Sequence, residues 1–235
     1  MLLWLGTWLY DGLPAAWCVH RDGNPICADP TNPDYRDYVT RQVTRLIGAD
    51  GFDADGFKID QLAYAPTVYD SMFGPRFGAI HPRKASGDRP RLHGDGFGCE
   101  LLHALQHTIY TSAKSAKPDA LVTSSTVHPY FRDTFDMVRI HDMGQVAPDI
   151  FDAMRARVEL AQAALPGIPI DTDDWIHTDY DMWMRYTSGS RILGVPCIFY
   201  AERFMRDWKG EPATTLIPMD DLRRIAAAWR KADGG

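Results

Sequence analysis

The hydrophobic positions of this chain fall into two kinds of segment that alternate along its length. Short apolar runs of the length expected for buried strands are flanked by turn-forming residues such as Gly, Pro and Asp. Between them, apolar residues recur at spacings of three and four, which is typical of helices with one buried face. This alternation predicts a parallel sheet whose strands are connected by helices. The strands are expected at residues 2–6, 56–60, 120–124, 137–142 and 168–171, with a sixth ending near Tyr200.

Some helix ends are also marked in the sequence. Asn32 is a good N-cap, Pro33 suits the first helical position, and Gly48 is a common terminator, so a helix is expected between them. Its apolar residues, which include Tyr35 and Val43, form one stripe. The remaining helices are expected over residues 101–109, 148–165, 179–193 and 222–229, with a short helical turn near 129–135.

The fold class predicted from this order is α/β, with a (β/α)8-type TIM barrel as its architecture. Six strand and helix units are recognisable, so the barrel is expected to be incomplete, with strands three to eight present and the N-terminal strands missing. A length of 235 residues suits one domain of this kind, so residues 1–235 are predicted to form a single, partial barrel domain. The polar stretch at about 64–96 is too long for a simple connector and is interpreted as an inserted loop over a site.

Composition narrows the class of partner. The chain is 45% hydrophobic and 24% charged, which allows a sizeable core. Its net charge is −6 without a basic cluster, so nucleic acid is a poor candidate partner. The start of the chain lacks the basic region of a signal peptide, and no stretch approaches the roughly 18 apolar residues that cross a bilayer. Four scattered cysteines argue against a zinc ribbon or a disulfide framework, and a cytoplasmic protein with reduced thiols and no membrane partner is expected.

The segment 55–60, Asp-Gly-Phe-Lys-Ile-Asp, carries the clearest candidate chemistry. Because side chains alternate along a strand, Lys58 and Asp60 are expected on one face and Phe57 and Ile59 on the other. The carboxyl ends of the strands form the active face of a parallel barrel. A lysine beside an aspartate favours the ionised carboxylate that a nucleophile requires. The alternative interpretation is a buried structural ion pair.

A second carboxylate, Asp142, is expected at the end of another strand. With the 120–124 strand between them, Asp60 and Asp142 would face each other across part of the barrel mouth, as the two acids that cleave a glycosidic bond do. One would attack the sugar and the other would protonate the leaving oxygen, and no cofactor or metal is needed. Asp142 could instead be a loop carboxylate bonded to nearby backbone. Further candidates for binding a sugar near strand ends are Trp8, Asp11, Arg139, His141, Asp171, Asp173 and Trp175.

Two of these segments resemble a known family. Segment 55–60 resembles the fourth-strand motif of retaining α-glycosidases in the clan of glycoside hydrolase families 27, 36 and 31, where Lys-x-Asp or Trp-x-Asp supplies the nucleophile. Segment 137–142 is similar to the sixth-strand region, where an arginine precedes the acid/base aspartate. The resemblance implies that Asp60 is the nucleophile and Asp142 the acid/base, with the lysine and the arginine as sugar or carboxylate partners. It implies hydrolysis of an α-galactoside or α-glucoside with retention, through a covalent glycosyl-aspartate intermediate.

The resemblance covers only part of the family pattern. Residues 123–128 lack the Cys and Gly-rich pattern that follows strand five in family 36, and strands one and two are not recognisable. The chain is therefore expected to be a fragment of a longer enzyme or to self-associate through an open sheet edge. One alternative function is a non-catalytic or truncated carbohydrate-binding barrel. Another is a metal-dependent hydrolase built on His103 and His107, which have i,i+4 spacing, with His141 and Asp142 as further ligands.

Overall fold

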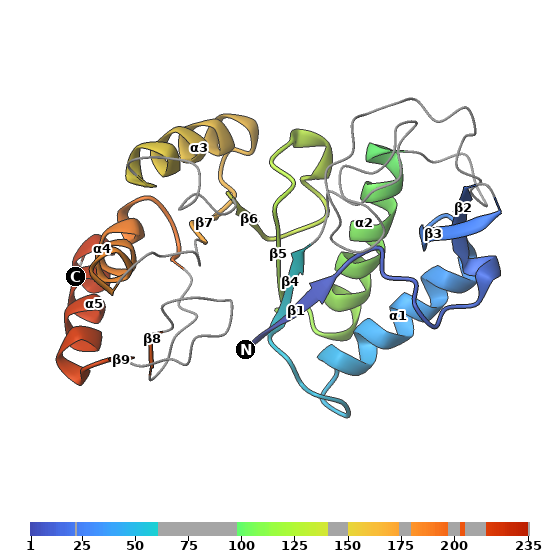
Figure 1. Cartoon of the computed structure of the whole chain (residues 1–235), viewed down its shortest axis with the longest axis horizontal. Helices are drawn as coiled ribbons and strands as arrows, with labels where there is room; N and C mark the ends of the chain where they lie inside the picture. The colour runs from blue at the N-terminus through green and yellow to red at the C-terminus, as the bar shows by residue number, and fades with distance from the viewer. Residues whose placement is uncertain are drawn as a thin grey trace. The chain divides into compact units, whose positions relative to one another are not determined.

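The computed structural model describes residues 1–21, 23–60, 98–140, 150–173, 180–196, 203–204 and 215–234. Its contacts divide the chain into two compact units. Unit 1 consists of Met1–Thr126 and Tyr130–Asp136, and unit 2 consists of Val127–Pro129 and Met137–Gly235. Figure 1 labels the helices and strands of both units.

Unit 1 contains a parallel arrangement of three strands. The middle strand β4 (Gly56–Asp60) pairs with β1 (Leu2–Gly6) on one side and with β5 (Leu121–Ser124) on the other. The carboxyl ends of these strands therefore lie at the same edge of the sheet. Helices α1 (Pro33–Ile47) and α2 (Cys99–Ala116) pack against each other beside these strands (Figure 1).

Helix α1 begins directly after Asn32, the N-cap that the sequence predicts. The side-chain oxygen of Asn32 accepts hydrogen bonds from the backbone N–H groups of Asp34 and Tyr35, and Gly48 follows the last helical residue. A cap of this kind contributes about 1 kcal/mol to helix stability. The apolar faces of the helices and strands of unit 1 are buried, among them Tyr35, Val43, Ile47, Phe57, Ile59, Leu101, Leu105, Ile109 and Val122.

A short antiparallel hairpin lies between β1 and α1, in a segment for which the sequence pattern predicted neither a strand nor a helix. Strand β2 (Cys18–Arg21) pairs with β3 (Asn24–Ala28), and Gly23 in the turn has a φ of 77°. The strands are four and five residues long, and their register shifts between Val19 and His20. Because the alternation is so short and irregular, the sequence pattern did not reveal it. A single 3₁₀ turn, η1 (Ala15–Trp17), precedes the hairpin.

Unit 2 again combines parallel strands with helices. Strand β6 (Met137–Arg139) pairs in parallel with β7 (Ile170–Asp171), and Val195 forms a further parallel bridge to Asp171. A buried cluster that includes Trp183 and Ile225 joins the fourth and fifth helices. The other elements of this unit are α3 (Ile150–Ala164), α4 (Tyr180–Gly189), η4 (Ser190–Ile192), β8 (Arg203–Phe204), β9 (Thr215–Leu216) and α5 (Met219–Ala232). The short turn η3 (Pro129–Phe131) lies where a helical turn was predicted.

The predicted α/β fold with a parallel sheet is confirmed. The hairpin β2–β3 and the short strands β8 and β9 were not predicted, and the other differences lie at the ends of elements. The strand expected at 137–142 ends at Arg139. The strand expected at 168–171 begins only at Ile170, and the helix expected at 179–193 ends at Gly189 before the 3₁₀ turn η4. The loop at 64–96 and the end of the strand near Tyr200 lie outside the described residues. Closure into a barrel and the single domain stay predictions.

No described helix combines the length and the apolar character needed to cross a membrane. Of the cysteines that the structure describes, Cys18, Cys27 and Cys99 form no disulfide, and the first two are buried.

Tyr180 links α4 to α5. Its hydroxyl donates a hydrogen bond to Oδ2 of Asp221 at 2.6 Å, beside the cluster that contains Trp183. Burial, followed by the hydrogen bond and negative charge of Asp221, raises the pKa of Tyr180 from 10.0 to about 12. Because the pKa is higher in the folded state, this contribution to stability is complete below about pH 10 and is lost as the pH rises through about 12.

We therefore expect the free energy of unfolding of the wild type to fall more steeply between about pH 10 and pH 12 than that of Tyr180→Phe, which cannot ionise at this position. Denaturant unfolding followed by circular dichroism across this range measures the difference. Parallel pH curves for the two proteins would show that the Tyr180 hydroxyl does not couple its ionisation to folding.

Candidate functional site

Strand β4 presents Lys58 and Asp60 on one face at its carboxyl end. Phe57 and Ile59 on the other face are fully buried, whereas Lys58 and Asp60 are half-buried. This is the alternation predicted from the sequence. The apolar face anchors the strand in the core, so that the two polar side chains project from a fixed backbone.

Strand β1 lies in register with β4 and contributes an aromatic side chain to the same face. Trp4 is the Cα partner of Lys58, and Gly6 is the partner of Asp60. The indole Nε1 of Trp4 donates a hydrogen bond to Oδ2 of Asp60 at 2.9 Å. The Trp4 side chain is 55% exposed, and Gly6 places no side chain beside the Asp60 carboxylate. The carboxylate therefore has a fixed donor on one of its oxygens.

The residue after β1 holds the main chain of Asp60. The hydroxyl of Thr7 donates to the Asp60 carbonyl oxygen at 2.8 Å, and the Thr7 backbone N–H donates to the same oxygen at 3.3 Å. Thr7 is buried. The next residue, Trp8, is 3% exposed and has a φ of 65°, which is uncommon for a bulky residue. Its carbonyl accepts a hydrogen bond from the backbone N–H of Ala28, which ties the end of β1 to the hairpin.

Strand β5 contributes one hydroxyl to the face of Lys58. Thr123 is the Cα partner of Lys58 and is buried, and its hydroxyl has no hydrogen-bond partner among the residues that the structure describes. Ser124 points to the opposite face. There Oε1 of Gln106 accepts hydrogen bonds from Ser124, Thr126 and Thr134 at 2.9, 3.1 and 3.2 Å. This second group of hydroxyls is thus a buried network that fastens α2 to the strand.

Unit 2 brings together an arginine and two carboxylates from the predicted set. Arg139 and Asp171 are Cα partners in β6 and β7, and Nε of Arg139 lies 3.1 Å from Oδ2 of Asp173. Arg139 is 2% exposed and Asp173 is fully buried. Oδ1 of Asp171 accepts a hydrogen bond from the backbone N–H of Asp173 at 2.8 Å, which fixes the turn after the strand. The Arg139–Asp173 contact is a buried ion pair.

Breaking this ion pair should destabilise the protein. Removal of one partner from a buried pair leaves an uncompensated charge and typically costs about 3–5 kcal/mol. We expect Asp173→Ala to lower the free energy of unfolding by about 3 kcal/mol, as measured by urea unfolding. Glu159→Ala on the exposed face of α3 is the matched control and should change it by less than about 0.5 kcal/mol. Equal effects of the two substitutions would contradict a stabilising role for the pair.

The other predicted site residues are placed differently. Asp11 is exposed, and Trp8 is buried rather than open to solvent. His141, Asp142 and Trp175 lie outside the described residues. The separation of the Asp60 and Asp142 carboxyl groups therefore stays a prediction. It is about 5–5.5 Å for a retaining enzyme and about 6.5–9.5 Å for an inverting one.

His103 and His107, the pair considered as a metal site, lie beside the carboxylate of Asp133. Nε2 of His103 lies 2.8 Å from Oδ1 of Asp133, and its ring stacks on that of His107 with centroids 5.6 Å apart. Although burial raises the pKa of the Asp133 carboxyl, the hydrogen bond and charge of His103 outweigh it and lower the pKa. Within the described ranges, no three His, Cys, Asp or Glu side chains are grouped as a metal site would require.

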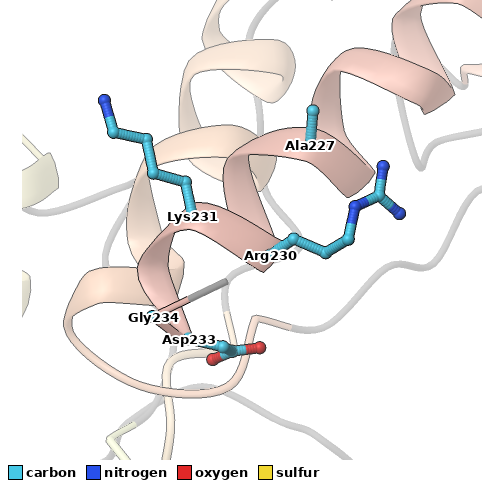
Figure 2. A pocket seen from close by; sticks show the side chains of 5 residues that line it. All are labelled: Ala227, Arg230, Lys231, Asp233 and Gly234. Carbon is cyan, nitrogen blue, oxygen red and sulfur yellow. The ribbon is translucent and has the colours of Figure 1, made fainter.

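A shallow hollow of about 520 Å³ lies at the end of α5. Figure 2 shows that Arg230 and Lys231 point in different directions around the last turn of the helix, and Asp233 lies below them. Asp233 also pairs with Arg191. All residues that line the hollow come from the end of this helix and the turn after it, so it contains none of the predicted site residues.

Thr7 was not considered for the site from the sequence, and Trp4 was considered only as one of several tryptophans near strand ends whose rings could stack on a sugar. Both contacts to Asp60 depend on the register in which β1 pairs with β4, and no local pattern specifies that register. One signal was present: if two predicted parallel strands end at the same edge, Trp4 and Lys58 occupy equivalent positions and share a face. Alignment of the strand ends would have placed Trp4 in the site.

Comparison with known proteins adds a distant structural likeness. No protein-family model matches the chain, and no curated protein matches it. Among solved structures, it is similar to a GH39 β-xylosidase from Caulobacter crescentus, with 16% identity over 76% of this chain and 38% of that chain and a TM-score of 0.39. It is also similar to Eubacterium rectale Amy13B, with 11% identity over 74% of this chain and 33% of that chain and a TM-score of 0.42.

A third similar structure is a monomeric β-xylosidase from Caulobacter crescentus CB15, with 14% identity over 77% of this chain and 38% of that chain and a TM-score of 0.37. The chain thus spans only a third to two-fifths of the length of the structures it matches. The resemblance to glycoside hydrolases is distant and concerns the fold.

Proposed function

We propose that this chain is a catalytic part of a retaining α-glycosidase that cleaves an α-galactoside or an α-glucoside. The observation that carries the proposal is the placement of Asp60. Its carboxylate stands at the carboxyl end of a parallel strand, shares a face with Lys58, and accepts the indole N–H of Trp4. A carboxylate that is both held by a donor and accessible is suited to attack a sugar.

The proposed reaction proceeds in two displacements. A carboxylate oxygen of Asp60 attacks the anomeric carbon, and the bond from that carbon to the leaving oxygen breaks while Asp142 gives its proton to that oxygen. Water then attacks the same carbon, Asp142 takes a proton from the water, and the ester bond to Asp60 breaks. Because the carbon is inverted twice, the product keeps the α configuration. The role of Asp142 rests on the sequence motif.

The same face of unit 1 offers groups that suit a sugar. The exposed ring of Trp4 can pack against the apolar C–H face of a pyranose, because aromatic rings combine a large apolar surface with a polar edge. The Lys58 ammonium lies on that face and can bond to sugar hydroxyls. The proposed binding roles of Arg139, Asp11, His141 and Trp175 rest on the sequence.

The proposal is tested by assay of the chain on aryl α-galactosides and aryl α-glucosides. We expect release of the aryl alcohol, and proton NMR at early times should show the α anomer as first product. An activated fluorosugar should form a stable ester, and peptide mass spectrometry should place it on Asp60. A β anomer as first product would mean inversion and would remove the covalent intermediate.

A chain that binds these sugars without hydrolysing them would instead be a carbohydrate-binding barrel. Isothermal titration with the free sugars separates that outcome from a protein that does not recognise them at all. Either result would overturn the proposed catalytic function.

A further inference from the structure

Strand β1 holds Asp60 at two separate points. The Trp4 indole donates to the carboxylate oxygen Oδ2 at 2.9 Å, and the Thr7 hydroxyl donates to the Asp60 carbonyl at 2.8 Å. A nucleophile must be aligned closely with the bond it forms, and small errors of placement cost large factors in rate. Contacts to both the side chain and the main chain of Asp60 therefore point to a role in orienting this residue, in addition to pairing β1 with β4.

We infer that Trp4 and Thr7 are positioning residues that fix the orientation of Asp60 for attack. The inference rests on the proposed function, because it assigns the nucleophile to Asp60. It extends that function to two residues of a strand that the family motifs quoted above do not include.

Trp4 acts on the carboxylate itself. Rotation of the carboxyl group would break a charge-assisted hydrogen bond, which is stronger than a neutral one. A donor on Oδ2 also favours the ionised carboxylate over the protonated one. Loss of this donor should therefore slow turnover and also change its dependence on pH.

Thr7 acts on the main chain. Its hydroxyl is buried and bonds to the carbonyl oxygen of Asp60, so it sets the direction in which the Asp60 side chain leaves the strand. It does not touch the carboxylate in this bond, and its removal should not change the charge of that group. The two positioning residues should thus give different kinetic signatures.

The test compares Trp4→Phe, Thr7→Val and Thr7→Ser with the wild type. We expect Trp4→Phe, which keeps a ring but lacks the donor, to lower kcat about tenfold and to move the acid limb of the pH profile of kcat/KM upward. Thr7→Val should lower kcat about tenfold with little change in KM and leave that limb in place. Thr7→Ser, which keeps the hydroxyl, should restore most of the rate. A normal kcat in both Trp4→Phe and Thr7→Val would overturn the inference.

A second measurement does not depend on turnover. The ¹⁵N–¹H signal of the Trp4 indole, identified by its absence from Trp4→Phe, should shift as Asp60 titrates and should lose that shift in Asp60→Asn. Normal turnover with a pH-independent signal would overturn the inference and leave the proposed function standing. An intact titration in a protein without glycosidase activity would remove the proposed function, and with it any catalytic meaning of the contact.

Discussion

Replacement of Asp60 by asparagine is expected to lower kcat for aryl α-glycosides by roughly 10⁴-fold or more, because loss of a catalytic nucleophile has effects of that size. Asparagine has the shape of aspartate and keeps a carbonyl oxygen that can accept the indole N–H of Trp4. The circular dichroism spectrum and the urea midpoint should therefore stay close to those of the wild type. Steady-state kinetics on both aryl substrates measure the effect.

This experiment has a control variant and a rescue by an external nucleophile. Asp119→Asn, on an exposed turn of the same unit, should leave kcat unchanged. Azide added to Asp60→Asn should attack the anomeric carbon in place of the missing carboxylate and yield a glycosyl azide of β configuration. If Asp60→Asn retains more than about a tenth of the wild-type rate, Asp60 is not the nucleophile.

Gly56→Ala is expected to prevent folding, or to destabilise the protein by more than about 4 kcal/mol. A Cβ atom on Gly56 would lie 1.8 Å from the backbone oxygen of Leu121, so β4 and β5 could not keep their register. The φ of 153° at Gly56 is also rarely adopted by residues with a side chain. Soluble yield and urea unfolding of the purified variant measure the loss.

Gly12→Ala is the matched control for this substitution. Gly12 also has a positive φ, of 82°, but nothing lies within 4 Å of an added Cβ. The control therefore separates the cost of a positive φ, about 1–2 kcal/mol, from the cost of the clash. If the two variants lose similar stability, the close approach of β4 to β5 is not what requires glycine at position 56.

Local signals in the sequence were sufficient for several elements. The bounds of β4 and α1 could be predicted because each is marked by residues within the segment: Asn32 and Gly48 at the helix ends, and alternating polar and apolar side chains in 56–60. The hairpin at Cys18–Ala28 could not, because its stability depends on pairing between two very short strands rather than on the pattern of either.

In the candidate site, too, local sequence patterns predict some features, whereas others depend on contacts between distant parts of the chain. The sequence could predict that Lys58 and Asp60 share a face, since alternation along one strand decides it. It could not predict that Trp4 bonds to Asp60 across 56 positions of the chain, because only the pairing of β1 with β4 brings them together. Likewise, Arg139 was identified as a candidate for binding, but its buried contact with Asp173 depends on the packing of unit 2.

The dependence of Asp60 on β1 has a consequence for inactivation. Among the strands that the structure describes, β1 is at the edge of its sheet, and an edge strand tends to detach before the helices that cover the core unfold. Partial detachment of β1 would release both bonds to Asp60 while most of the helical structure persists. Enzymatic activity should therefore disappear at lower urea concentrations than the helical circular dichroism signal, and should return in full on dilution.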